Sequence, residues 1–144
     1  MSAIVYRDTL DGITPNRLRG FFVGWPFPPS PEHHLRLLQG SDYCVLALDG
    51  PGGRVVGFVT ALTDGVLTAY LPLLEVLPDY QARGVGSELM RRMLQQLEPF
   101  PNVDLLCDPE LQPFYARFGL QPVRGMVRRN RQALARLQPM HAKS

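Results

Sequence analysis

The chain of 144 residues is 45% apolar and 19% charged, a balance typical of a globular protein, and we expect one domain over residues 1–144. Its formal net charge of +2 is too small to indicate a nucleic-acid partner. No apolar run approaches the roughly 18 residues of a membrane span, and the first residues do not resemble a signal peptide, so we expect a cytoplasmic protein without membrane contact.

Basic residues are concentrated near the C-terminus. Residues 122–144 contain six Arg and Lys side chains and no acidic one, which leaves nine basic and thirteen acidic groups in residues 1–121, a net charge of −4. Such a tail can be a solvated face or can meet an acidic partner, and no aromatic residues are interleaved with its arginines as single-strand binders require. Residues 129–144 therefore form a possible basic terminal segment, and the sequence does not decide between these two roles.

The two cysteines, Cys44 and Cys107, each lie in an apolar run that predicts a strand. No CxxC pair occurs, and His33 and His34 are not spaced with the cysteines for a zinc site. We expect buried, reduced thiols and no bound metal.

The first part of the chain predicts one strand and two short helices. Residues 3–8 alternate as a strand does. The Thr-Pro pair at 14–15 supplies a cap and a first position for one helix, and the Ser-Pro pair at 30–31 does the same for a second helix that Gly40 ends. A proline-rich elbow, PFPPS, separates the two helices.

The middle of the chain predicts an antiparallel meander followed by a helix. Three segments have the residue pattern of β-strands, and glycine-containing turns separate them. The segments are residues 42–49, 54–64 and 66–77. Pro72 indicates a bulge or a local loss of pairing in the third of these strands. Apolar residues then recur every four positions from 85 to 98, the pattern of a helix with one buried stripe.

The last part predicts a strand at 103–108, a helix at 109–119, a final strand at 120–130 and a terminal helix at 131–137. This order of elements predicts an α+β protein, with a mixed, mostly antiparallel sheet of about six strands and helices on both faces. Such an arrangement would bury the apolar side chains of the strands and helices.

The loop before the helix at 85–98 has the features of an anion site. Residues 81–87, Gln-Ala-Arg-Gly-Val-Gly-Ser, bring backbone N–H groups to a helix start, where the helix dipole adds positive potential. Gly84 and Gly86 allow a close approach to the backbone, and Arg83 suits phosphate oxygens. The loop lacks the lysine of a Walker A motif and the third glycine of a dinucleotide fingerprint. Taken alone, it can be a phosphate site or a simple strand-to-helix turn.

Two segments resemble one known family. Residues 76–90, VLPDYQARGVGSELM, resemble the acetyl-CoA-binding motif of the GCN5-related N-acetyltransferases (GNAT), whose core is Gln/Arg-x-x-Gly-x-Gly/Ala. Residues 114–120, FYARFGL, resemble the family's Phe-Tyr-x-x-x-Gly-Phe element. The resemblance implies a GNAT-like fold in which the fourth strand, 66–77, splays from the fifth, 103–108. It also implies acetyl-CoA as cofactor, with the pantetheine arm in the gap.

The resemblance further implies which residues bind the cofactor. Main-chain groups of Val76 and Leu77 would bond the pantetheine amides, and the loop 81–87 would hold the pyrophosphate. Asp108 stands where many relatives have an asparagine. The side-chain amide that contacts pantetheine in those relatives is therefore absent at this position. The expected cofactor-binding residues are Val76, Leu77, Gln81, Ala82, Arg83, Gly84, Val85, Gly86, Ser87 and Asp108.

The implied reaction is attack of an amine on the thioester carbonyl. Tyr115 matches the family's tyrosine that protonates the leaving thiolate, and a phenol with a reference pKa near ~10 keeps its proton at neutral pH. The Val76 N–H is the expected oxyanion donor. Glu75 is the candidate general base, because burial at the strand end would raise its pKa. Strand alternation places Glu75 opposite Val76, so a water chain or an already neutral amine are alternatives.

Acceptor selection is expected in residues 21–34, FFVGWPFPPSPEHH, because the first two helices and their connection wall the acceptor site in relatives. The substrate-binding candidates are Phe22, Trp25, Phe27 and His33, with Phe21 and His34 beside them. The same aromatics can instead belong to the core.

The sequence therefore predicts an acetyl-CoA-dependent N-acetyltransferase that acts on a small-molecule amine and can form a homodimer. Two alternatives stay open: a transferase for protein or peptide amines, and a non-catalytic CoA-binding module with an acidic partner.

Overall fold

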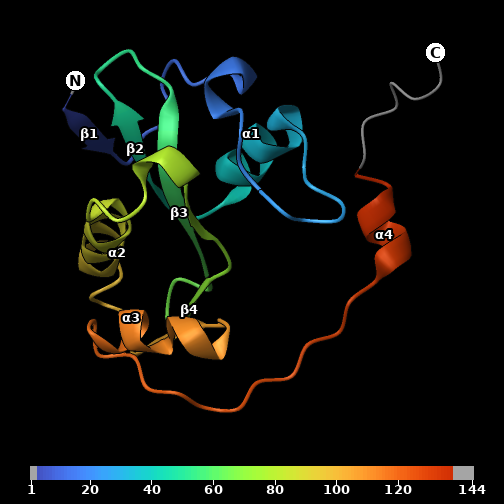
Figure 1. Ribbon diagram of the computed structural model, residues 1–144. Helices are drawn as coiled ribbons and strands as arrows, with labels where there is room; N and C mark the ends of the chain where they lie inside the picture. Colours follow the sequence, from blue (N-terminus) through green and yellow to red (C-terminus); the bar gives the residue numbers. More distant parts are fainter. Residues whose placement is uncertain (1–2, 138–144) are drawn as a thin grey trace.

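The computed structural model describes residues 3–137 and contains a mixed six-stranded sheet with helices on both faces, as predicted (Figure 1). The strand order is β1-β2-β3-β4-β6, and β5 continues beside β3. Every pair is antiparallel except β4 and β6, which are parallel. The strands are β1 (Ile4–Arg7), β2 (Tyr43–Asp49), β3 (Val55–Thr63), β4 (Thr68–Leu71), β5 (Leu74–Val76) and β6 (Asn102–Leu105).

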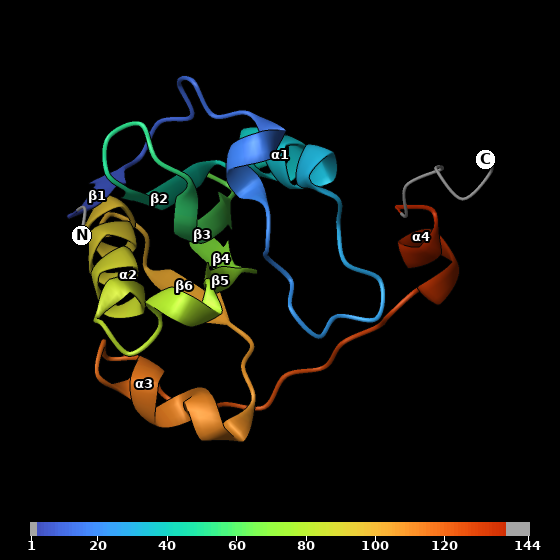
Figure 2. The ribbon, with the colours of Figure 1, turned by 45° about the horizontal axis from the view of Figure 1, so that its top comes forward.

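The helices cover the sheet from two sides: α1 lies on one face, and α2 lies on the other (Figures 1 and 2). The cap predicted for α1 is present, because the Ser30 hydroxyl accepts a hydrogen bond from the His33 N–H at 3.1 Å. Among residues 3–137, no helix combines the length and apolar character needed to cross a membrane. The helices are η1 (Pro15–Leu18), α1 (Pro31–Gly40), η2 (Pro78–Tyr80), α2 (Val85–Gln96), η3 (Pro109–Leu111), α3 (Gln112–Ala116) and α4 (Arg131–Ala135).

The central strands are buried on both faces, so alternate side chains enter two separate cores. In β2, Leu46 and Leu48 pack with α1 and η1, while Val45 and Ala47 pack with α2. The predicted stripe of α2 is confirmed, since Val85, Leu89, Met93 and Leu97 are all buried in the second core. Gly57 allows α2 to lie close to β3: a Cβ there would be 3.0 Å from the Leu89 side chain.

The third predicted strand is divided into β4 and β5 at Pro72. Leu62 pairs with Tyr70 and Val59 pairs with Leu74, so three steps along β3 correspond to four along its partner. This extra residue is a β-bulge, as Pro72 suggested. Below the bulge β4 pairs with β6 as far as Leu105, and above it β5 pairs with β3, which leaves the predicted splay between β5 and β6.

Two sequence predictions of secondary structure are wrong. The helix expected from Pro15 onward is a single turn, η1, because Gly20, Phe22 and Gly24 have positive φ angles of 95°, 64° and 82° that cannot continue a helix. The final strand expected at 120–130 is also absent. The described residues 121–130 contain no helix or strand, are all exposed and pair with no strand of the sheet.

We call residues 3–120 the body and residues 121–137 the arm. The arm leaves the body after α3 and runs apart from it to α4 in both ribbon views (Figures 1 and 2). The predicted terminal helix is present as the short α4, whereas Lys143 and the rest of the basic terminal segment beyond residue 137 lie outside the described residues.

Candidate active site

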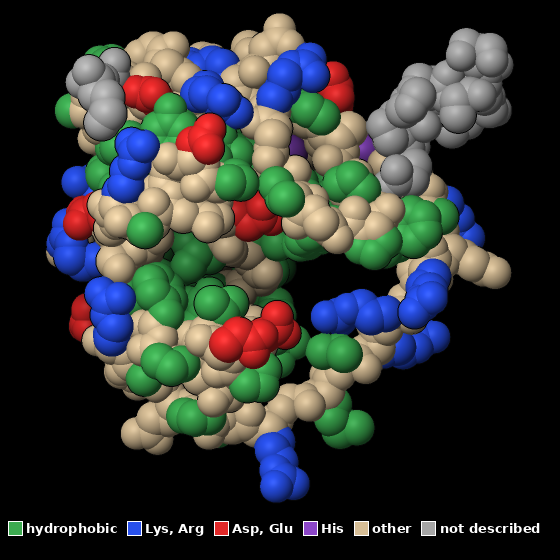
Figure 3. Space-filling model, in the orientation of Figure 1, with side chains coloured by type: hydrophobic (Ala, Val, Ile, Leu, Met, Phe, Trp, Pro, Cys, Tyr) green, Lys and Arg blue, Asp and Glu red, His purple; other side chains and the backbone are tan. Residues whose placement is uncertain are grey.

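A large cleft of about 1590 Å³ lies where β5 and β6 diverge. Residues of β5, β6, α3 and the elbow line it on the body side, and residues of the arm line it on the other. Figure 3 shows this cleft as a hollow between body and arm, with acidic side chains on the body side and basic ones on the arm. The splay therefore creates space for a long ligand between two strands.

The backbone of β5 offers hydrogen-bonding groups to this gap. The Leu77 N–H donates to the Val56 carbonyl at 2.8 Å, and the Leu77 carbonyl accepts from the Tyr80 N–H at 2.9 Å. Because hydrogen-bonded pairs alternate along an antiparallel ladder, the N–H and C=O groups of Leu74 and Val76 point away from β3, toward β6. The geometry thus directs the Val76 N–H and both backbone groups of Leu74 toward the gap. The Val76 carbonyl already accepts from the Gln81 amide at 3.0 Å, and both backbone groups of Leu77 are bonded within the chain.

The loop 81–87 has the shape expected of an anion site. Ala82 and Gly84 both have left-handed backbone, with φ angles of 62° and 81°. The first helical hydrogen bond of α2 runs from the Glu88 N–H to the Gly84 carbonyl at 3.0 Å, so the N–H groups of Val85, Gly86 and Ser87 have no partner within the helix. Alternating backbone conformations and unpaired N–H groups are features that bind phosphate.

Two side chains support the loop. The Gln81 amide donates to the Val76 carbonyl at 3.0 Å, which fastens the loop to β5. The Arg117 guanidinium, from the residue after α3, donates to the Ser87 hydroxyl at 3.2 Å and stacks on Phe114 at 5.6 Å. Sequence reasoning missed Arg117, although its position inside the second family motif could have suggested it.

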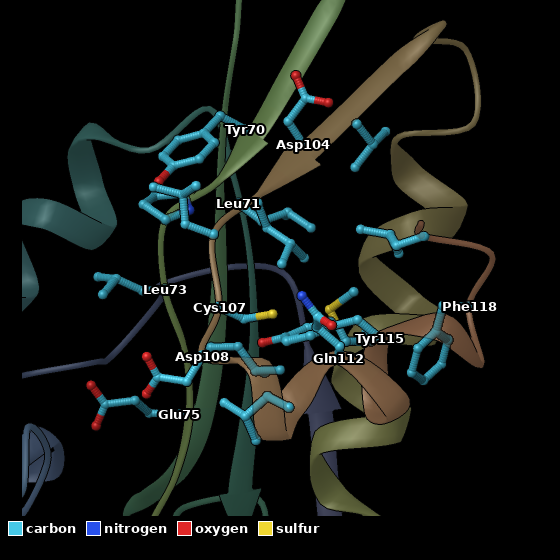
Figure 4. Close-up of a pocket in the computed structure, with 18 of the residues that line it drawn as sticks. Tyr70, Leu71, Leu73, Glu75, Asp104, Cys107, Asp108, Gln112, Tyr115 and Phe118 are labelled. Carbon is cyan, nitrogen blue, oxygen red and sulfur yellow. The ribbon is translucent and has the colours of Figure 1, made fainter. Parts of the chain in front are cut away.

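Tyr115 projects from α3 into the cleft toward β6 (Figure 4). Its ring packs on Phe114 with centroids 5.0 Å apart. Burial, together with the nearby Cys107, raises the pKa of the phenol above its usual value. The hydroxyl therefore holds its proton at neutral pH and can donate it.

Glu75 lines the cleft from β5, and one of its oxygens is already engaged. Oε1 accepts a hydrogen bond from the Phe22 N–H at 2.9 Å, which fixes the elbow against the sheet. Oε2 is buried and has no hydrogen-bond partner among the described residues. Burial raises the pKa of this carboxyl, and the Phe22 N–H partly lowers it. A buried carboxyl oxygen without a partner suits a group that receives a proton or an ammonium.

The structure separates the four substrate-binding candidates. Trp25 lines the cleft and is 43% exposed. Phe22 is 3% exposed and belongs to the core, where it packs on Trp25 and His34. Phe27 and His33 do not line the cleft, and the His33 ring instead lies 3.1 Å from the Ser30 hydroxyl. The geometry therefore favours Trp25 among the four candidates, and it places Phe22, Phe27 and His33 outside the lining of the cleft. For Phe22, the left-handed backbone accompanies a side chain that is buried in the core.

Residues after β6 complete the floor of the cleft. Asp108 lines it without capping η3, and Figure 4 shows it near Glu75, on the segment that follows β6. Cys107 is a free, half-buried thiol that also lines the cleft, whereas Cys44 is free and buried in β2. In residues 3–137, no group of three or more His, Cys, Asp or Glu side chains could hold a metal ion.

The structure combines a gap between β5 and β6, a loop with the features of an anion site at the start of α2, and a tyrosine that projects into the cleft. The model of the acetyltransferase (GNAT) family matches residues 10–120, and the chain belongs to this family. Members use acetyl-CoA as the acetyl donor, and the gap and the loop fit its pantetheine arm and pyrophosphate.

Relatives of assigned activity are acetyltransferases as well. The chain is 27% identical over 128 residues to GCN5-related N-acetyltransferase 1 of Arabidopsis thaliana and 30% identical over 130 residues to serotonin N-acetyltransferase 2 of Oryza sativa. Each alignment covers 84% of this chain but 65% of the relative, so the chain spans about two thirds of the length of these relatives. A crystal structure from Deinococcus radiodurans R1, classed as an acetyltransferase, superposes with a TM-score of 0.87 at 46% identity over 94% of this chain and 97% of that one.

Proposed function

We propose that the protein transfers the acetyl group of acetyl-CoA to the primary amine of a small molecule. The observation that carries this proposal is the gap itself: the N–H groups of Leu74 and Val76 in β5 point into it from one wall, and Tyr115 projects from the other. The similarity to a rice serotonin N-acetyltransferase supports an amine acceptor, and the exposed Trp25 in the cleft wall suits one with an apolar body.

The residues of the cleft can be given roles in direct transfer. The amine nitrogen would attack the thioester carbonyl, and the Val76 N–H would stabilise the negative charge that forms on its oxygen. Collapse of that intermediate breaks the carbon–sulfur bond, and the Tyr115 hydroxyl would give its proton to the leaving thiolate. The proton lost by the amine would pass to Glu75 Oε2, directly or through water.

The other expected cofactor contacts follow the same geometry. The backbone groups of Leu74 and the remaining lone pair of the Val76 carbonyl would bond the pantetheine amides, and the loop 81–87 would hold the pyrophosphate with Arg83 and Arg117 beside it. Cytoplasmic location and action on a small molecule stay predictions, and so does the homodimer.

An amine screen tests the function. Arylalkylamines, aliphatic amines, aminoglycosides and peptides with free amines are incubated with acetyl-CoA, and released thiol is measured. We expect release with at least one small amine, and a decrease of about 10²- to 10⁴-fold in kcat for Tyr115→Phe with unchanged cofactor affinity. Release only with peptides would favour a protein acceptor. No release of thiol with any amine, together with retained binding of CoA, would favour a non-catalytic binding module.

A further inference from the structure

The gap between β5 and β6 can be reached from both faces of the sheet. Phe114 and Tyr115 pack in the core under α2, which begins at the loop 81–87. Glu75 pairs with Phe58, whose side chain lies in the core under α1, so the Glu75 side chain lies on the α1 face. Because the cofactor is assigned to the loop and thus to the α2 face, an acceptor amine would enter the gap along the α1 face.

A row of side chains continues from the gap along the α1 face. Leu62 lies four residues after Phe58 in β3, so the two side chains share a face. Leu62 pairs with Tyr70 of β4, and Tyr70 pairs with Asp104 of β6. Directly paired residues lie on the same face, and both Tyr70 and Asp104 line the cleft. The acceptor face therefore carries an acidic side chain beyond the gap as well as Glu75 at the gap.

The chain between Asp104 and Asp108 gives the length of this row. Figure 4 shows Asp108 near Glu75, and it shows Asp104 at the other end of the view beside Tyr70. Four residues of chain span at most about 14 Å. A ligand that touches both ends of the row must therefore be elongated.

The acidic side chains of this row have no cation beside them in the described part of the chain. Asp104 and Asp108 are exposed, and within residues 3–137 the ion pairs join Glu88 to Arg91 and Arg92 on α2 instead. Glu75 Oε2 is buried and also lacks a hydrogen-bond partner among these residues. Carboxylates that line a cleft without a counter-charge favour a cationic ligand.

Aromatic rings border the same surface. Tyr70 is exposed directly opposite Asp104, and Trp25 is exposed in the cleft wall. The face of an aromatic ring attracts an ammonium group, and its body contacts methylene groups. Carboxylates and rings together suit a flexible carbon chain with a positive charge at its end.

The arm presents the opposite charge to the cleft, through Arg124 and Arg129. Both arginines belong to residues 121–130, which contain no helix or strand, whereas pairing with Tyr70 holds Asp104 in β6. A group that is already fixed loses less conformational freedom when a ligand binds. We therefore expect Asp104, and not the arginines of the arm, to select the far end of the acceptor.

We propose that the acceptor is a linear amine with a second positive charge at its far end, a terminal diamine, and that Asp104 binds this charge. The inference rests on the proposed function, because it describes the acceptor of the same reaction. The reacting amine would lie beside Glu75, the carbon chain would lie along the α1 face, and the second ammonium would contact Asp104 and the Tyr70 ring. Asp104 is a specificity-determining residue, since it lies away from the reacting atoms.

Three probes with the same unbranched carbon chain test the charge. Terminal diaminooctane has an ammonium at its far end, octylamine has a methyl group, and aminooctanoic acid has a carboxylate. Thiol release from acetyl-CoA gives kcat/KM for each. After correction for its two equivalent amines, diaminooctane should exceed octylamine by about fivefold, with aminooctanoic acid lowest. Added salt should reduce this preference, because Asp104 is exposed. Equal values, or a preference for either other probe, would overturn the proposal.

Variants assign the preference to one side chain. Asp104→Asn should lower the ratio of kcat/KM for diaminooctane to that for octylamine by about threefold or more, and Asp104→Lys should make aminooctanoic acid the best of the three probes. Asp11→Asn removes the same charge at an exposed position that does not line the cleft, and it should leave the ratio unchanged. Wild-type ratios in both Asp104 variants would refute the role of this residue.

Binding measurements separate this inference from the proposed function. Calorimetric titration of the three probes is carried out with CoA present, which has no acetyl group to transfer. Tighter binding of diaminooctane than of octylamine, without thiol release from acetyl-CoA, would support the diamine site and contradict the transfer reaction. Thiol release with equal affinities for these two probes would support transfer and contradict the second charge. Failure of diaminooctane to bind would also overturn the inference.

Discussion

Gly86→Ala separates the proposed cofactor role of the loop from its structural role. Gly86 is the second residue of α2, and an added Cβ would lie 3.7 Å from Phe114 and 3.8 Å from Val76, both ordinary contacts. Since alanine is favoured over glycine in a helix by up to about 1 kcal/mol, the unliganded protein should be slightly more stable. The new methyl group would nevertheless stand between β5 and α3, in the channel assigned to the cofactor. Stability and affinity should therefore change in opposite directions.

The size of the effect follows from linkage. If the methyl group costs about 1.4 kcal/mol of binding, affinity falls about tenfold. With acetyl-CoA at about 100 times the wild-type Kd, the ligand stabilises the wild type by about 2.7 kcal/mol and the variant by about 1.4 kcal/mol. At about 2.1 cal/mol/K per residue, a chain of 144 residues has an unfolding entropy near 0.3 kcal/mol/K. The ligand should then raise Tm by about 9 °C in the wild type and about 5 °C in the variant.

Thermal unfolding with and without acetyl-CoA measures both quantities. Gly40→Ala is the matched control, because it makes the same change in helix α1, where a Cβ would meet nothing within 4 Å. The control should keep the full ligand shift. If Gly86→Ala also keeps it, the cofactor does not pass this point, and the assignment of the loop is wrong.

Three further predictions concern side chains of the site and core. Glu75→Gln keeps an acceptor for the Phe22 N–H but removes a buried charge. Burial raises the pKa of this carboxyl, so its stabilising contribution is present in acid and is lost as pH rises through that pKa. Urea unfolding should therefore show the variant to be more stable than the wild type at neutral pH and equally stable in acid. Burial lowers the pKa of His34 to about 4, so stability should fall by about 3 kcal/mol as pH falls from about 6.5 to 4, and His34→Leu should remove this slope in the same assay. Arg117→Gln should weaken CoA binding three- to tenfold in a calorimetric titration without a change in Tm, and unchanged affinity would leave its bond to Ser87 purely structural.

The elements that the sequence predicted well are those controlled by neighbours in the chain. The Ser30 cap and the stripe of α2 depend on residues a few positions apart, and both are present. The anion loop also follows from local glycine chemistry. For the same reason, the loop that is proposed to hold the cofactor could be identified before the fold was known.

The predictions that failed depend on distant contacts. The elbow leaves the helical path at Phe22, whose N–H is held by Glu75, 53 residues away. That contact places Phe22 in the core and leaves Trp25 in the cleft, a distribution that a run of aromatics cannot reveal. The strand pattern at 120–130 failed for this reason as well, because a strand also needs an edge to pair with, and residues 121–130 pair with no strand of the described chain.

The bulge at Pro72 also limits how this gene can change over time. Side chains alternate along a strand, so loss or gain of one residue between Leu71 and Leu74 would reverse the facing of everything after it up to the loop. Glu75 and Val76 would then exchange places, which would direct a carboxylate into the apolar core and the Val76 backbone away from the gap. We therefore expect substitutions at the bulge to be tolerated more readily than insertions or deletions, and the length of this short segment to vary less among relatives than its composition.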